Sequence, residues 1–247
     1  MAGRELPPTS AFAGDDGAAD PALRAALGAW AADPGALPEV VAALRTARVL
    51  VPVVTQDRSA TAVALAAPDG RTALPVFSDL DALAAWHPDA RPVPTPAAQA
   101  AAAALAEGWE LMVVDPGGPV TVLVPGPAVR ALATGSAWNP AVSRGVVRDD
   151  VVDAIRRAAR VPQVRWVRVV PGGTAEVAVV LGVRPGLDRG ELDSLLADLG
   201  RHPVAAEIDS LEIRVERALS PDGGDEAPGP ARRARSPRRS GRPAPPG

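Results

Sequence analysis

The chain has 247 residues and contains no cysteine, no lysine and no tyrosine. Without cysteine it can form no disulfide bond, no thiolate metal site and no cysteine nucleophile. Without lysine it can form no Schiff base and no P-loop, whose lysine contacts the phosphates of a nucleotide. Because only two histidines are present as well, no set of nucleophile, base and orienting group is visible. We therefore expect a protein that is not an enzyme and uses no cofactor or metal.

Long apolar runs are also missing. No stretch reaches the roughly 18 apolar residues that a transmembrane helix requires. Residues 1–14 contain no apolar segment of the length found in a signal peptide. The absence of cysteine is compatible with a reducing compartment. The sequence thus predicts a cytoplasmic protein without a membrane span.

Aromatic residues are scarce, at 3% of the chain, although apolar residues make up 47%. Much of the apolar fraction is alanine and valine, so we expect a core of small side chains with a few large anchors. The available anchors are Phe12, Phe77 and five tryptophans. This amount of apolar material is sufficient for a core without disulfide bonds.

The charges are unevenly distributed along the chain. All 26 basic residues are arginine, against 29 acids. Six arginines lie after residue 226 in a segment without acids, so residues 1–226 hold 20 arginines and a net charge of −9. An acidic folded part disfavours nucleic-acid binding, except weakly through the tail. The arginines of this candidate electrostatic tail are Arg232, Arg233, Arg235, Arg238, Arg239 and Arg242. The alternative interpretation is a solvated low-complexity end.

Composition divides the chain into four parts. Residues 1–20 show no periodicity and are interpreted as a flexible leader. Turn-forming residues cluster around 134–144, so we predict a first domain over residues 21–143 and a second over 144–217. Residues 218–247 are rich in proline, glycine, serine and arginine, which predicts a disordered tail. The expected fold class is α+β, with two small lobes of antiparallel or mixed sheets flanked by helices.

Local signals in the first domain predict its elements. Asp20 is a good N-cap for a helix over residues 22–32. A strand over residues 48–54 and a hairpin around Asp69-Gly70 predict three antiparallel strands. Ser78 is expected to cap a helix that ends at Trp86. Further helices are expected over residues 38–45, 97–107 and 125–133, and further strands over 110–114 and 120–124.

The second domain has a simpler pattern. A helix is predicted over residues 149–160, and a Pro-Gly-Gly-Thr turn joins strands over 163–170 and 175–182. Asp188 is expected to cap a helix that ends near residue 199, and a last strand is predicted over 206–215. This order suggests an antiparallel sheet with its helices on one face.

Several pieces of the first domain together resemble one family. They are the strand over residues 48–54, the segment RTALPVFSD at 71–79, the helix that ends at Trp86, and the turn from Asp115 to Pro119. In this order they look like the N-terminal domain of the SseB family, over roughly residues 23–133. The second domain is similar in layout to the C-terminal domain of the family. The resemblance implies an α+β fold but no specific reaction. Bacterial members are named for enhanced sensitivity to serine.

Apolar residues around the helix that ends at Trp86 form a candidate surface. Phe77, Leu83 and Trp86 recur at roughly helical spacing, for which core packing is the simplest interpretation. If the edge of Trp86 is exposed beside the nearby prolines, it would suit a protein partner, because exposed aromatic side chains are enriched at interfaces. The candidate interaction surface therefore consists of Phe77, Trp86, His87 and Pro88.

Other polar residues have structural interpretations. His87 and His202 each precede a proline at an expected helix end, where they suit turns. The turn that starts at Asp115 lacks the lysine and the glycine spacing of a P-loop, so a hairpin is predicted. Asp79 and Asp81 lie in a first helical turn, where they offset the helix dipole.

The sequence supports two functional hypotheses of different classes. The first is a non-enzymatic interaction module for an unidentified protein partner. The alternative is a small-molecule sensor or regulator linked to serine metabolism, which only the family resemblance suggests. A hydrolase built on Asp79, Asp89 and Asp115 is disfavoured because no arranged acid and base pair is visible. The pattern gives no indication of the oligomeric state.

Overall fold

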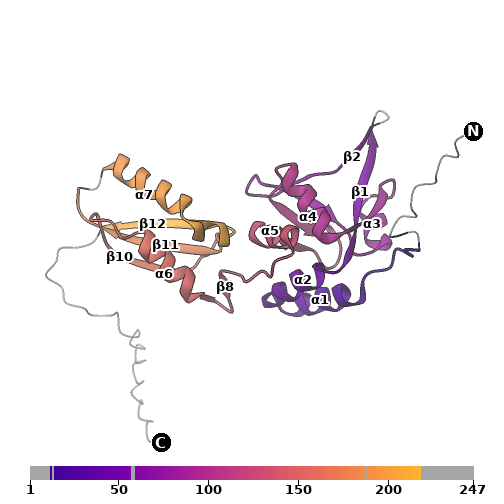
Figure 1. Cartoon of the computed structure of the whole chain (residues 1–247), viewed down its shortest axis with the longest axis horizontal. Coiled ribbons are helices and arrows are strands. Elements are labelled where there is room, and N and C mark those ends of the chain that lie inside the picture. Colours follow the sequence, from indigo (N-terminus) through magenta and orange to yellow (C-terminus); the bar gives the residue numbers. More distant parts are fainter. Residues whose placement is uncertain (1–11, 13, 57–58, 187, 218–247) are drawn as a thin grey trace, which may run out of the picture.

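The computed structural model describes residue 12 and residues 14–56, 59–186 and 188–217. It contains two lobes that lie side by side (Figure 1), which confirms the predicted α+β class. The predicted tail, 218–247, and most of the predicted leader lie outside the described residues. None of the helices in the described part of the chain is both long and apolar enough to cross a membrane.

The N-terminal lobe contains two sheets covered by helices. Its elements, in chain order, are α1 (Pro21–Ala32), η1 (Pro34–Ala36), α2 (Leu37–Leu44), β1 (Arg48–Gln56), β2 (Ser59–Ala62), β3 (Leu65–Ala66), β4 (Thr72–Val76), α3 (Leu80–Trp86), β5 (Arg91–Pro96), α4 (Ala97–Ala106), β6 (Leu111–Val114), β7 (Val122–Val124) and α5 (Gly126–Thr134). One sheet has the order β2-β1-β5 and the other β3-β4-β6-β7. Strands β4 and β6 are parallel, and the other pairs are antiparallel. A bridge between Leu50 and Phe77 connects the two sheets.

Two sequence expectations for this lobe are wrong. We expected three strands in one antiparallel sheet, but they belong to two sheets. Strand β2 pairs with β1, whereas β3 pairs with β4 across the Asp69-Gly70 turn. The proline-rich segment Arg91–Pro96 was not expected to be a strand, yet it forms the edge strand β5. An edge position tolerates alternating prolines, because the missing N–H groups can all point away from the neighbouring strand.

The core of the N-terminal lobe lies between the helices and the strands. Leu23 of α1, Leu44 of α2, Met112 of β6 and Leu132 of α5 are almost completely buried in one cluster. The helix α1 begins as predicted, since the Asp20 side chain accepts hydrogen bonds from the first turn and proline occupies the first helical position. The predicted core of small side chains is present, because α4 contributes only alanines to the fully buried set.

The C-terminal lobe is a three-stranded sheet with two helices. Its elements are β8 (Val142–Ser143), β9 (Val146–Val147), α6 (Asp149–Ala158), β10 (Val164–Pro171), β11 (Val177–Val183), α7 (Arg189–Arg201), η2 (Pro203–Glu207) and β12 (Leu211–Arg217). The sheet order is β10-β11-β12. Strands β10 and β11 form the predicted hairpin, but β11 and β12 are parallel. The prediction that all strands of this sheet are antiparallel is therefore wrong for one pair. The helix α7 carries the chain back along the sheet, so β12 starts at the same end as β11 and runs parallel to it.

The helices of this lobe cover one face of the sheet. Alternate residues of β11, from Val177 to Val183, are buried in a cluster with Ile155 of α6 and with Leu195 and Leu199 of α7. Asp188 caps α7 as predicted, with a capping box completed by Glu191. This second core is a separate cluster from that of the N-terminal lobe.

Candidate functional site

A pocket of about 500 Å³ lies at the edge of the N-terminal lobe where the parallel strands β4 and β6 end. The carboxyl ends of parallel strands are a frequent location for ligand sites, because the chain leaves the sheet there and opens a crevice. One wall is α1, with Arg24 and Gly28, and the opposite wall is α3. The turn from Asp115 to Pro119 completes the pocket.

Trp86, the last residue of α3, forms the aromatic wall of this pocket. Its ring is half-buried, with its centroid 5.2 Å from that of Phe77. A Cβ atom built on Gly117 would lie 3.8 Å from Trp86 Cδ1, so the ring is in van der Waals range of the turn. Phe77 itself is completely buried and cannot contact a partner directly. The prediction that Phe77 is part of the interaction surface is therefore wrong. Phe77 packs against Trp86 from the interior.

His87 and Pro88 lie outside the pocket lining. The backbone N–H of His87 donates to the carbonyl of Leu83 and closes α3. Its ring lies 5.8 Å from that of Trp86, and within the described residues its buried Nδ1 has no hydrogen-bond partner. Pro88 is exposed. Among the four residues of the predicted surface, Trp86 is the one that reaches the pocket.

Asp115 holds the floor of the pocket together. Its side chain is buried, and it accepts hydrogen bonds from the Ser78 backbone N (2.7 Å) and the Ser78 Oγ (2.8 Å). Burial raises the pKa of Asp115 above its ordinary value, while the two bonds from Ser78 act in the opposite direction. These bonds cross-link the end of β4 to the end of β6. The expectation that Ser78 caps α3 is therefore wrong: the cap is Asp79, which accepts from the backbone N of Ala82 at 2.8 Å.

The backbone at Asp115 is in the left-handed region, with φ of 49°. Few side chains other than glycine, asparagine and aspartate adopt this conformation readily. The carbonyl of Asp115 also accepts from Thr121 Oγ1 at 2.9 Å, so both sides of the turn are fixed. The predicted hairpin turn between β6 and β7 is confirmed.

The chemistry of the pocket combines an aromatic wall with carboxylates and one arginine. Asp79 and Asp81 lie at the start of α3, and Arg24 lies on α1. The hydroxyl of Ser78 is not free to react, because it is buried and donates to Asp115. In the described part of the chain there is no group of three or more side chains of the types that ligate metals. The arrangement suits binding of a group that is both apolar and positively charged, since a cation is attracted to the face of an indole.

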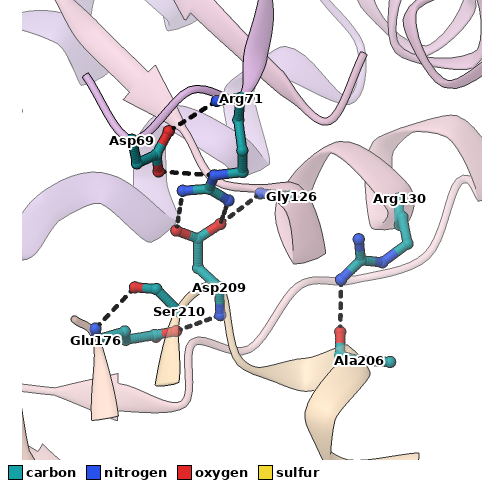
Figure 2. A network of polar contacts seen from close by, with 8 residues as sticks. All are labelled: Asp69, Arg71, Gly126, Arg130, Glu176, Ala206, Asp209 and Ser210. Atoms are coloured by element: carbon teal, nitrogen blue, oxygen red, sulfur yellow. Dashed lines mark hydrogen bonds and ion pairs between the residues drawn. The ribbon is translucent and has the colours of Figure 1, made fainter. Parts of the chain in front are cut away.

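A second polar site joins the two lobes, and Asp209 is at its centre (Figure 2). Arg71, the residue before β4, donates to Asp209 Oδ1 at 2.8 Å and to Oδ2 at 2.9 Å. The backbone N of Gly126 donates to the same Oδ1 at 2.9 Å. Asp69 holds the guanidinium from the other side, with 2.8 Å between Nε and Oδ2. Asp209 raises the pKa of Arg71, because its carboxylate stabilises the charged guanidinium.

Glu176 and Arg130 extend this junction. The carboxylate of Glu176 accepts from the backbone N of Asp209 at 2.7 Å, and its own backbone N donates to Ser210 Oγ at 2.9 Å (Figure 2). Burial raises the pKa of Glu176. Arg130 of α5 donates to the carbonyl of Ala206 at 2.8 Å. Sequence reasoning missed this junction, because its charged partners are far apart in the chain and match no local motif.

The comparisons with known proteins identify the N-terminal lobe. Residues 23–131 match the family model of the SseB protein N-terminal domain, from α1 into α5, a range that includes all of the residues that line the Trp86 pocket. The resemblance seen in the sequence is thus confirmed for these residues, which form an SseB N-terminal domain. The likeness of the second lobe to the C-terminal domain of the family stays a prediction. The searches of curated proteins and of solved structures gave no match.

Proposed function

We propose that this protein is a non-enzymatic interaction module that binds a protein partner in the Trp86 pocket. The observation that carries the proposal is the half-buried indole of Trp86 on the wall of a pocket of about 500 Å³, against the rigid turn at Asp115. Aromatic anchors in preformed pockets supply much of the energy of protein interfaces. A fixed turn lowers the entropic cost of binding, because the pocket does not have to be ordered by the partner.

The charges of the pocket favour a particular kind of partner segment. Asp79 and Asp81 are at the start of α3, and Asp81 is exposed. A basic side chain next to an apolar one would meet both the carboxylates and the indole face. We therefore expect a partner segment that presents an apolar side chain beside arginine or lysine.

Two further observations support binding over catalysis at this site. Neither histidine lines the pocket. Ser78 and Asp115 line the pocket, but both are largely buried and the hydroxyl of Ser78 donates to the carboxylate of Asp115, so this pair is already engaged in holding the turn. General acid and base catalysis requires such groups within hydrogen-bond reach of the substrate.

Replacing Trp86 by alanine tests the proposal. The full chain is used to select binders from a displayed library of random 12-residue peptides, and the affinity of each enriched peptide is measured by calorimetry. We expect peptides with adjacent apolar and basic residues, and a loss of affinity of tenfold or more in Trp86→Ala, in the range of hot-spot truncations. Val146→Ala is the control, because Val146 is exposed and does not line the pocket. Peptides that bind Trp86→Ala as tightly as the original chain would contradict the proposal.

A second candidate function is the sensing of a small molecule related to serine. The pocket volume is in the range of small-molecule sites. Arg24 on α1 and Asp79 and Asp81 near α3 offer opposite charges for the carboxylate and ammonium groups of an amino acid. L-Serine at about 100 times its Kd should raise the free energy of unfolding by about 2.7 kcal/mol. The rise should be absent in Arg24→Gln, and no shift in the melting temperature of the original chain would reject this candidate.

A further inference from the structure

The sheet of the C-terminal lobe has one face that its helices do not cover. This face carries alternate residues of the three strands: Trp166, Arg168 and Val170 of β10, Ala178, Val180 and Gly182 of β11, and Glu212, Arg214 and Glu216 of β12. The side chains of Arg168, Arg214 and Glu216 are each more than half exposed. The central residues of this face, Ala178, Val180 and Gly182, are buried, so its exposed part is made by side chains of the two outer strands.

Trp166 lies flat on this surface. A Cβ atom built on Gly182 would be only 2.1 Å from Trp166 Cε2 and 2.3 Å from its Nε1, so the indole occupies the space above the glycine. Trp166 as a whole is still 39% exposed. The guanidinium carbon of Arg168 is 5.7 Å from its centroid, and Arg168 Nη2 lies 3.6 Å from Glu216 Oε1. The indole thus packs against the backbone at Gly182, the guanidinium of Arg168 lies over the ring, and part of the side chain stays exposed.

Arginines gather at the same end of the sheet. Val164, Val183 and Arg217 lie in one row across the three strands, and the backbone N of Arg184 donates to the carbonyl of Gln163 in the next row. The exposed arginines at this end are Arg160, Arg165, Arg184, Arg189 and Arg217. Within the described residues, none of these five has an acidic partner within ion-pair distance, whereas Arg71, Arg148 and Arg168 do.

Acidic residues lie at both ends of the sheet, since Asp188 and Glu191 at the start of α7 and Glu216 of β12 are at the end that holds these arginines. The opposite end of the sheet holds Glu176, Glu207 and Asp209, and the latter two contact arginines at the junction of the lobes. The strand β12 ends at Arg217 in the row next to Trp166. Further along the sequence, six arginines lie between residues 232 and 242. No acidic residue follows residue 226.

We propose that this end of the C-terminal lobe binds single-stranded nucleic acid, in addition to the partner binding proposed for the other lobe. An unpaired base would stack on Trp166, and the exposed arginines would contact the phosphates. Stacking platforms combined with basic side chains are the features that bind single strands without sequence preference. A lipid surface fits less well, because membrane-anchoring aromatics project outward into the headgroups, whereas Trp166 lies along the sheet. The phosphate contacts would come from the five exposed arginines of this end, which have no acidic partner among the described residues.

The test measures fluorescence anisotropy of a labelled 20-nucleotide oligo(dT) titrated with the full chain, at salt concentrations between 50 and 300 mM. We expect Trp166→Ala to weaken binding by about tenfold, within the range for loss of one stacked base, and Trp166→Phe to retain most of the affinity. Arg165→Ser combined with Arg184→Ser should reduce the slope of log affinity against log salt by about 1.4, since each phosphate contact on a single strand contributes about 0.7. Arg91→Ser, an exposed arginine of the other lobe, is the matched control and should change nothing.

Several outcomes would overturn the proposal. One is the absence of oligonucleotide binding at 50 mM salt. Another is binding that survives Trp166→Ala and the Arg165/Arg184 double variant but disappears when the six tail arginines are changed to serine in the full chain, which would assign the contact to the tail alone. A third is equal binding of duplex DNA or of vesicles containing phosphatidylserine, because neither presents an unpaired base. Circular dichroism of each variant confirms that a loss of binding does not reflect unfolding.

Discussion

The variant Asp115→Ala should lose about 4 kcal/mol of unfolding free energy, measured by urea denaturation. The change leaves the buried backbone N and the hydroxyl of Ser78 without their acceptor, and each unsatisfied buried group costs roughly 1–3 kcal/mol. Alanine at a φ of 49° adds about 1 kcal/mol of backbone strain. Because these bonds join the ends of β4 and β6, the Trp86 pocket should lose its floor and its partner affinity as well.

The conservative variant Asp115→Asn separates shape from charge. Asparagine keeps an acceptor for Ser78 and tolerates the left-handed region, so the loss should be nearer 1 kcal/mol. The raised pKa of Asp115 means that the folded chain binds its proton more tightly than the unfolded chain. Aspartate therefore loses stability as pH rises from 3.8 through its folded pKa, whereas asparagine does not titrate. The advantage of the original chain over Asp115→Asn should be largest at acid pH, and an advantage that grows with pH would contradict this account.

The variant Asp209→Ala should uncouple the two lobes. It removes the two bonds from Arg71 and the acceptor of the buried Gly126 N, and breaking a largely desolvated ion pair costs on the order of 3 kcal/mol. The two lobes have separate hydrophobic clusters, so we expect polar contacts to hold them together. The variant weakens these contacts. We expect calorimetry to show two unfolding transitions in place of one, and small-angle scattering to show a larger radius of gyration.

The control for this experiment is Asp198→Asn. Asp198 forms an exposed ion pair with Arg201 one turn away on α7, and such pairs contribute less than about 1 kcal/mol. A single transition at an unchanged temperature in Asp209→Ala would show that the polar network does not couple the lobes. An unfolded product would be recognised by its circular dichroism, and Arg71→Met then provides a second way to break the same contact.

The sequence predicted those features that depend on neighbouring residues. The caps at Asp20 and Asp188, the Asp69-Gly70 turn and the Asp115 turn are all confirmed, because each is determined by side chains within a few positions. Core packing was the simplest interpretation of Trp86, and the half-buried ring corresponds to the alternative of an exposed edge. These signals were sufficient for the α+β class and for the SseB N-terminal domain.

What the sequence did not predict depends on distant partners. Ser78 was expected to cap a helix, but its actual partner is Asp115, 37 positions away. Arg71 and Asp209 are 138 positions apart and carry no local signal of their pairing. The strand Arg91–Pro96 could not be recognised, because its prolines are acceptable only at a sheet edge, and which strand lies at the edge is decided by the whole fold.

The position of Asp209 also has a consequence for the order of events during synthesis. The elements of the N-terminal lobe are complete by Thr134, and the acceptor for Arg71 and Gly126 N lies about 75 residues later. At ordinary translation rates of 5–20 residues per second, this interval lasts about 4–15 seconds. The first lobe thus has time to fold on the ribosome while its junction surface faces water. The ion pair between Arg71 and Asp209 can form only after this interval, when the chain that supplies Asp209 has been made.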